Sequence, residues 1–91
     1  MLTPEKSTQF KRDQRKAEKQ GKDFAKLRDV IKLLLEEKPL PQKCVDHLLS
    51  GNWKGYRDCH IENDWVLIYK IDKSQKVLLL QRLGSHAELF G

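Results

Sequence analysis

Three histidines are the residues of this 91-residue chain best suited to proton transfer. His47, His60 and His86 all lie in its C-terminal half. Asp64 follows His60 at a spacing of four residues, and Arg82 precedes His86 at the same spacing. Histidine has an ordinary pKa of about 6.5, so both of its protonation states are populated near neutrality. The region therefore holds candidates for an acid, a base and a phosphate-binding cation.

This set of residue types fits cleavage of RNA by its own 2′-hydroxyl. The hydroxyl must lose a proton to attack phosphorus, the 5′-oxygen must gain one, and the transition state carries extra negative charge. Histidines suit both proton transfers, Asp64 could accept a proton or orient an imidazole, and Arg82 could bind phosphate oxygens with two donors. This route needs no cofactor. Each residue also has a structural interpretation, and the residue types alone do not decide between the two.

Aromatic and cysteine residues suggest two further possibilities. Tyr56, Trp65 and Phe90 could stack on unpaired bases, although Trp65 begins an apolar run that also fits a core. Cys44-x-x-His47 and the adjacent Cys59-His60 supply zinc-ligand types. Neighbouring strand residues point to opposite faces, so Cys59 and His60 cannot easily share one ion. We therefore expect no metal, and we expect both cysteines to be reduced thiols in the cytoplasm.

Two helices are predicted in the N-terminal half. The first covers Ser7–Gln20, with Ser7 or Thr3 as N-cap, and stops at Gly21. The second follows the N-cap Asp23 and ends before Pro39. Its apolar residues recur at spacings of three and four, which places them on one face; they are Phe24, Leu27, Val30, Ile31, Leu34 and Leu35.

Three strands are predicted after a long irregular stretch, at Trp53–Ile61, Asp64–Ile71 and Lys76–Leu83, joined by short turns as an antiparallel meander. The second and third contain consecutive apolar residues, which predicts burial on both faces of the sheet. The two helices can cover one face. We expect the tail Ser85–Phe90 to fold back over the other. The sequence thus predicts an α+β fold in one domain, residues 1–91.

Charge and hydropathy narrow the possible partners. The net charge is +5, which favours a polyanionic partner such as nucleic acid, an anionic membrane surface or an acidic protein. No apolar run approaches the roughly 18 residues that a membrane-spanning helix needs, so no membrane partner is expected.

Three ordered segments carry a family resemblance. Residues 53–60 read WKGYRDCH, residues 64–70 read DWVLIYK, and residues 82–91 read RLGSHAELFG. With these blocks at matched spacing, the chain closely resembles the YafQ branch of the RelE/ParE toxin superfamily. The likeness covers the whole chain in layout and is densest from Asp46 to Gly91.

The resemblance implies a bacterial type II toxin that cleaves mRNA in the A site of the 70S ribosome during translation. It also implies a cognate antitoxin of the DinJ kind, a ribbon-helix-helix protein with an acidic toxin-binding part, through which alone the toxin would reach operator DNA. The implied fold is two N-terminal helices packed on a curved antiparallel β-sheet, with a short C-terminal helical turn. The family usually begins with a strand, whereas Pro4 leaves little room for one here, so that strand is expected to be very short or absent.

The resemblance also assigns roles by position. Acid–base catalysis falls on four residues: His47, His60, Asp64 and His86. Arg82 is the implied phosphate-stabilising cation, and Phe90 the implied base-stacking or substrate-orienting residue. Substrate contacts are expected at three positions of the matched segments: Lys54, Arg57 and Trp65. Which residue is the acid and which the base stays open.

Two other functions fit the sequence. One is a non-catalytic relative that binds a protein target such as gyrase, or a basic ribosome-binding module. The other is a free-standing ribonuclease that degrades naked RNA. A pure binder has no need of three histidines and an aspartate around one cleft, whereas ribosome dependence would distinguish the two nucleases.

Overall fold

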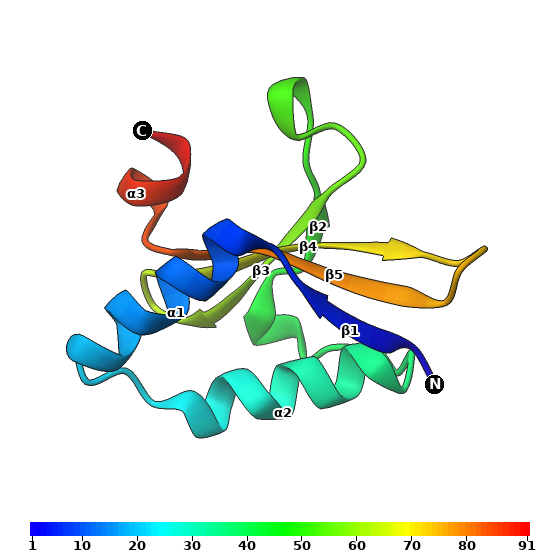
Figure 1. Ribbon diagram of the computed structural model, residues 1–91, viewed down its shortest axis with the longest axis horizontal. Coiled ribbons are helices and arrows are strands. Elements are labelled where there is room, and N and C mark those ends of the chain that lie inside the picture. The colour runs from blue at the N-terminus through cyan, green and yellow to red at the C-terminus, as the bar shows by residue number, and fades with distance from the viewer.

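A computed structural model describes residues 1–91 and shows an α+β fold (Figure 1). Two helices lie against one face of a five-stranded sheet, and a short C-terminal helix lies on the other side. Along the chain the elements are β1 (Thr3–Lys6), α1 (Thr8–Lys19), α2 (Phe24–Leu35), the 3-10 turn η1 (Gln42–Cys44), β2 (His47–Leu48), the 3-10 turn η2 (Gly51–Trp53), β3 (Arg57–Glu62), β4 (Trp65–Asp72), β5 (Val77–Gly84) and α3 (His86–Phe90). None of the helices is long and apolar enough to cross a membrane.

Both predicted helices are confirmed, with their caps. The Ser7 hydroxyl accepts a hydrogen bond from the Phe10 N–H, and the Asp23 carboxylate accepts one from the Ala25 N–H. These bonds satisfy amide groups that a helix start leaves without partners. Gly21 follows the end of α1 with a φ of 74°, a left-handed conformation that glycine adopts without strain.

The sheet has the strand order β1-β5-β4-β3-β2. The predicted meander of β3, β4 and β5 is confirmed, but β1 runs parallel to β5, so a purely antiparallel sheet is wrong. The first strand was expected to be very short or absent; it is present and short, with four residues in β1. The Thr3 amide donates to the Lys76 carbonyl just before β5, and the Ser7 amide donates to the Leu80 carbonyl of β5, which turns the nitrogen of Pro4 toward the open edge. A proline at this position removes no bond from the sheet.

The start of the first predicted strand, Trp53–Ile61, is corrected by the structure. Trp53 lies in η2, and β3 begins at Arg57. Gly55, with a φ of 93°, allows the turn between them. The two residues of β2, a strand that was not predicted, pair with Arg57 and Asp58.

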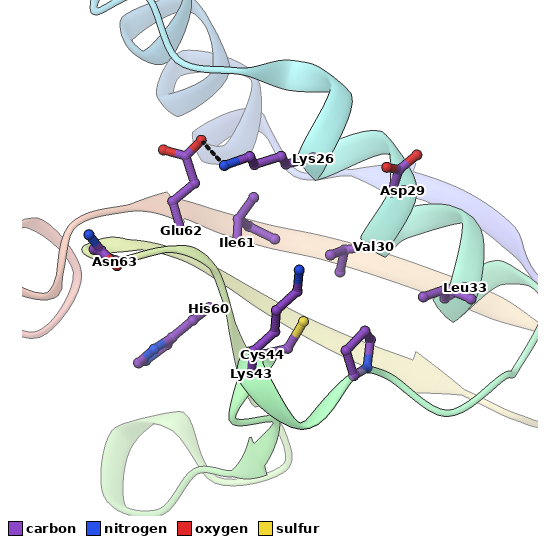
Figure 2. Close-up of a pocket in the computed structure, with 11 residues that line it drawn as sticks. Lys26, Asp29, Val30, Leu33, Lys43, Cys44, His60, Ile61, Glu62 and Asn63 are labelled. Carbon is purple, nitrogen blue, oxygen red and sulfur yellow. Dashed lines mark ion pairs between the residues drawn. The ribbon is translucent and has the colours of Figure 1, made fainter.

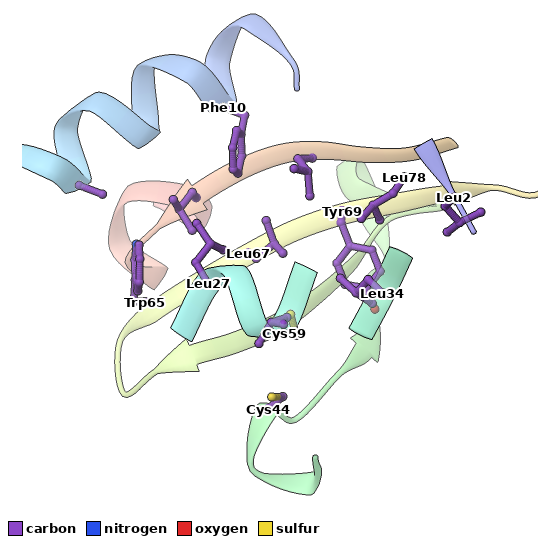
Figure 3. Packing of buried hydrophobic residues seen from close by; sticks show 14 residues of the cluster. Leu2, Phe10, Leu27, Leu34, Cys44, Cys59, Trp65, Leu67, Tyr69 and Leu78 are labelled. Atoms are coloured by element: carbon purple, nitrogen blue, oxygen red, sulfur yellow. The ribbon is translucent and has the colours of Figure 1, made fainter. Parts of the chain in front are cut away.

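Apolar side chains fill both faces of the sheet. The main cluster packs α1 and α2 against the sheet and includes Phe10, Leu27, Leu67 and Tyr69 (Figure 3). A smaller cluster on the opposite face joins Val66 and Ile68 of β4 to Leu89 of α3. The predicted fold-back of the tail is confirmed. The tail does not cover this face by itself. Residues 49–56, called here the η2 segment, also pack there through Leu49, Trp53 and Tyr56.

A buried carboxylate joins α1 to β5. Asp13 accepts hydrogen bonds from the Arg82 Nε at 2.8 Å and from the Leu83 amide at 3.0 Å. It lies beyond the end of β1, where β5 has no strand on that side. The other charged residues of α1 are exposed, yet Asp13 is buried. The hydrogen bonds of Asp13 with Arg82 and Leu83 help to position α1 against β5.

We expect Asp13→Ala to lower the free energy of unfolding by about 2–4 kcal/mol, because it leaves a buried amide and a half-buried guanidinium without their acceptor. Urea denaturation measures the change. Asp29→Ala, an exposed aspartate on α2, is the matched control and should change stability by about 0.5 kcal/mol or less. Equal effects of the two substitutions would contradict this role for Asp13.

Candidate active site

Strand alternation brings two of the histidines to the same face of the sheet. His60 lies opposite Val66, and His47 lies opposite Asp58, which in turn lies opposite Ile68. Side chains paired across a ladder project to the same face. Val66 and Ile68 both belong to the cluster under α3. His47, Asp58 and His60 therefore face the side of the sheet where α3 lies.

Helix α3 supplies the third histidine and is held by a capping box. The Ser85 hydroxyl accepts from the Glu88 amide, while the Glu88 carboxylate accepts from the Ser85 amide. Glu88 also forms an ion pair with Lys16 of α1. Gly84 admits α3 close to β5, since a Cβ there would lie 3.1 Å from the Glu88 Oε1. These contacts position His86 at the first turn.

Asp64 orients His86 by two hydrogen bonds to one oxygen. Its Oδ1 lies 3.0 Å from the His86 backbone nitrogen and 2.9 Å from the His86 Nδ1. The backbone bond, followed by the ring bond, lowers the pKa of Asp64, so the carboxylate is ionised at neutral pH. An ionised carboxylate only accepts, so Nδ1 carries the ring proton. The His86 Nε2 is left to exchange protons with a substrate.

The other predicted residues of this face surround His86. The ring centroids of His60 and His86 lie 5.1 Å apart, and those of His86 and Phe90 lie 6.0 Å apart. Phe90 is 42% exposed, so its ring is available to a ligand. The structure thus brings His60, Asp64, His86 and Phe90 together from two separate elements, β3 and α3, and the turn after β3.

His47 reaches this face through a carboxylate that the sequence analysis missed. Its Nδ1 lies 3.0 Å from the Asp58 Oδ1 and 3.0 Å from the Val45 carbonyl oxygen. Asp58 is 2% exposed. Burial raises the pKa of Asp58, and His47, His60 and His86 oppose that rise in decreasing order. The available signal was its spacing of two from His60, which places both side chains on one face of β3.

Arg82 lies at the edge of the same face, opposite Ile68. Its Nε and one terminal nitrogen bind Asp13, at 2.8 and 3.4 Å. A guanidinium carries five N–H donors, so this pairing leaves donors for a phosphate. Asp13 therefore holds the Arg82 side chain in place while some of its N–H donors stay available to a ligand.

The three expected substrate contacts lie in different surroundings. Lys54 is exposed beside η2. Arg57 lies opposite Tyr69, on the helix face, where it forms two hydrogen bonds with Asp46. Trp65 is 1% exposed and packs its ring against Phe24. Strand alternation turns Arg57 and Trp65 toward the helices, on the opposite face of the sheet from His47 and His60.

A cleft of the fold lies apart from most of the histidines. It has a volume of about 500 Å³ and lies between α2, η1 and the end of β3 (Figure 2). His60 is the one histidine on its rim. A smaller cleft of about 360 Å³ adjoins Asp64 and is lined by Gln20, Lys22, Trp65, Ser85 and Glu88. The catalytic residue types therefore gather on an open surface, where shape alone would not locate them.

No group of three or more histidine, cysteine, aspartate or glutamate residues is arranged to hold a metal ion. Cys44 and Cys59 are buried free thiols in the helix-side core, whereas His47 and His60 face α3. Burial raises the pKa of both thiols. The cysteines therefore belong to the packing of the core.

Comparison with known proteins agrees with this geometry. The profile of the family described as bacterial toxin of type II toxin-antitoxin system, YafQ, matches residues 2–91. The chain belongs to the YafQ family. The mRNA interferase toxin YafQ of Escherichia coli strain K12 is 48% identical over 88 residues, covering 96% of this chain and 94% of that protein.

Solved structures of relatives share the whole fold. The crystal structure of YafQ from E. coli strain BL21(DE3) has a TM-score of 0.91, 44% identity, and full coverage of both chains. YafQ in the crystal structure of the E. coli DinJ-YafQ complex has a TM-score of 0.89, 46% identity, and full coverage of both chains. The YafQ family assignment therefore holds at the level of fold as well as sequence.

The docking of α3 should depend on pH through Glu88. Its bonds with Lys16, then with the Ser85 amide, lower the pKa of Glu88 from 4.5 to about 2. A lowered pKa means that its stabilisation is present above pH 4.5 and is lost as the pH falls toward 2. Backbone NMR signals of α3 measured across this range should report progressive undocking.

Glu88→Gln is the matched control for this titration. Glutamine can keep the capping box but has no charge for Lys16. We expect the α3 signals of this variant to lose the part of the pH response that Glu88 supplies. Identical titration of α3 in both proteins would show that Glu88 does not hold the helix.

Proposed function

We propose that this YafQ-family protein, a single toxin domain over residues 1–91, is an mRNA interferase that cleaves by 2′-hydroxyl attack with histidine acid–base catalysis. The observation that supports this most is the joint placement of His60, Asp64, His86 and Phe90. Two imidazoles 5.1 Å apart can serve the two proton transfers on one phosphodiester. The E. coli relative, named an mRNA interferase toxin, supports the same reaction.

Asp64 and Phe90 organise the reaction around His86. Asp64 keeps the proton of His86 on Nδ1, so Nε2 faces the substrate as a proton acceptor when neutral or as a donor when protonated. An exposed Phe90 ring beside His86 offers a platform for a base and so aligns the sugar that carries the 2′-hydroxyl. His60 and His47 complete the set, on the same face of the sheet.

Arg82 balances the charge of the transition state. Asp13 holds two of its nitrogens, which orders the side chain before substrate arrives. The remaining donors are directed by that pairing and can bind the equatorial phosphate oxygens as negative charge develops there. No part of this sequence of steps requires a metal ion. Lys54 adds an exposed positive charge near the same surface.

The open form of the site favours a reaction on the ribosome. The side chains of His86 and Asp64 are 49% and 64% exposed. A site this open cannot by itself hold a flexible RNA strand in an in-line geometry, and positioning contributes a large part of such rate enhancements. We infer that the 70S ribosome presents the mRNA, and that the protein acts in the cytoplasm where translation occurs.

The partner that fits this family is an antitoxin. A DinJ–YafQ complex in E. coli supports a cognate, DinJ-like ribbon-helix-helix antitoxin for this chain. The toxin has a net charge of +5, which suits an acidic toxin-binding segment. Contact with operator DNA would then occur through the antitoxin complex.

His86→Ala tests the catalytic assignment. The backbone amide that binds Asp64 is retained, so the fold should be unchanged. We expect cleavage of mRNA on programmed ribosomes to fall by about a hundredfold or more, since the variant loses a proton-transfer group. If this protein folds, binds ribosomes and cuts as fast as the wild type, the assignment is wrong and a non-catalytic binder becomes the better account. Naked RNA, cut equally fast by the wild type, would indicate a free-standing ribonuclease.

Phe90→Ala separates a substrate role from a structural one. The ring is 42% exposed, whereas its neighbour Leu89 is 7% exposed. We expect Phe90→Ala to slow cleavage about tenfold, the loss of roughly one stacking interaction, with the urea midpoint little changed. Leu89→Ala is the comparison and should lower the midpoint. A large loss of stability in Phe90→Ala would instead make it a core residue.

A further inference from the structure

Asp58 is a buried carboxylate that the proposed reaction has not used. Its side chain is 3% exposed, and its Oδ1 accepts no hydrogen bond. A carboxylate in such surroundings destabilises the folded state, because it loses the water that would solvate its charge. An asparagine of the same shape would avoid that loss. A residue that is unfavourable for stability and lies among three histidines suggests a part in the reaction.

The ring of His47 lies beside this carboxylate. The Nδ1 of His47 is 3.0 Å from the Asp58 Oδ1, within ion-pair range, while its hydrogen bond is directed to the Val45 carbonyl, also at 3.0 Å. Both neighbours of Nδ1 are acceptors. Nδ1 must therefore carry the proton, which leaves the lone pair of neutral His47 on Nε2.

The chain beside His47 is held in a conformation that suits this arrangement. Val45 has a φ of 46°, in the left-handed region that β-branched residues rarely adopt. The next residue, Asp46, accepts hydrogen bonds from Arg57 at 3.2 and 3.3 Å and from the Tyr69 hydroxyl. These bonds keep the Val45 carbonyl directed at the ring. Arg57, expected to contact substrate, thus acts on the loop that carries His47.

We propose that Asp58 is a positioning residue for His47: its buried charge holds the Nδ1–H side of the ring and stabilises the imidazolium that forms when Nε2 accepts the 2′-hydroxyl proton. This inference rests on the proposed acid–base reaction. In the step concerned, the 2′ O–H bond breaks and the Nε2–H bond forms. The 2′-oxygen bonds to phosphorus, the bond from phosphorus to the 5′-oxygen breaks, and the 5′-oxygen takes a proton from a second histidine. Asp58 stays ionised throughout and takes no proton.

The charges around Asp58 support this direction of action. The titratable groups that influence it are His47, His60 and His86, which favour its ionised form, and Asp46, which opposes it. His47 has the strongest effect of the three histidines. The negative charge of Asp58 lies 3.0 Å from the His47 Nδ1, so it can stabilise a positive charge that forms on the ring.

The test compares Asp58→Asn with the matched control Asp72→Asn. Asp72 is the last residue of β4, partly exposed, and it accepts hydrogen bonds from the Ser74 hydroxyl and the Gln75 amide. Single-turnover cleavage of mRNA on programmed ribosomes gives the rate constant at saturating protein and the half-saturating concentration. We expect Asp58→Asn to lower the rate constant about tenfold or more, with half-saturation unchanged, and Asp72→Asn to change neither.

Two measurements separate positioning from a structural role. Ring ¹⁵N shifts of His47 distinguish the imidazolium from the neutral forms, and the imidazolium fraction at pH 6.5, near the ordinary pKa of histidine of about 6.5, should fall in Asp58→Asn. The urea midpoint should stay equal or rise, because a desolvated charge is removed. In a His47→Gln background, Asp58→Asn should cause no further loss of rate, since both changes act on one group.

Specific results would overturn this inference alone. They are an undiminished rate in Asp58→Asn, an equal further loss in the His47→Gln background, or ring shifts showing wild-type Nδ1 without a proton. The last needs no variant, so it holds even if Asp58→Asn fails to fold. Full activity of His86→Ala would instead remove the proposed reaction itself. Inactive His86→Ala with fully active Asp58→Asn leaves the reaction standing and rejects only the role of Asp58.

Discussion

The register between β3 and β4 is the constraint on which the rest of this structure depends. Because side chains alternate along each strand, the pairing of His60 with Val66 and of Asp58 with Ile68 fixes which residues meet α3 and which meet the helices. A shift of one residue would send His60 into the helix-side core and bring Cys59 to the reacting surface. The apolar run of β4, buried on both faces, holds this register from both sides.

The two faces of the sheet have different tasks. The helix side buries the large cluster with Phe10, Leu27 and Tyr69 and supplies most of the apolar contact. The α3 side is covered only by a five-residue helix and the η2 segment, and it carries the ionisable groups. A thin cover keeps these groups close to solvent and to RNA. The residues that stabilise the fold and the ionisable residues of the site therefore lie on opposite faces of one sheet.

Sequence patterns predicted the local structure well, because caps and spacing act over a few residues. Ser7 and Asp23 start their helices as expected, and consecutive apolar residues in β4 predicted that the tail would cover the second face. The parallel β1 was not predictable in the same way, since its partner lies far along the chain and Pro4 argued against a strand. The predicted start of β3 at Trp53 was also too early, since a large apolar residue fits a turn that packs on the core as well as it fits a strand.

The candidate site was predicted in its residue types but not in its pairings. His60, Asp64, His86 and Phe90 meet as the family resemblance implied, although no local rule brings a strand, a turn and a tail together. Asp58 and Asp13 were missed because an aspartate in sequence gives no sign of burial, which arises only when distant elements pack over it. That Arg57 and Trp65 face the helices could not be predicted, because the face on which a strand residue lies depends on the register of the sheet.

Three contacts cross from α1 to the end of the chain: Ser7 with Gln81, Asp13 with Arg82, and Lys16 with Glu88. They join residues 74, 69 and 72 positions apart. Contacts of such long range form late in folding, because the loop entropy must be overcome first. The Arg82 guanidinium and α3 are thus held by the same late-forming contacts that dock α1 on the sheet. A compact folding intermediate that lacks these three contacts contains all the residues of the site, but Arg82 and α3 are not yet in place. Toxicity would therefore require the last step of folding.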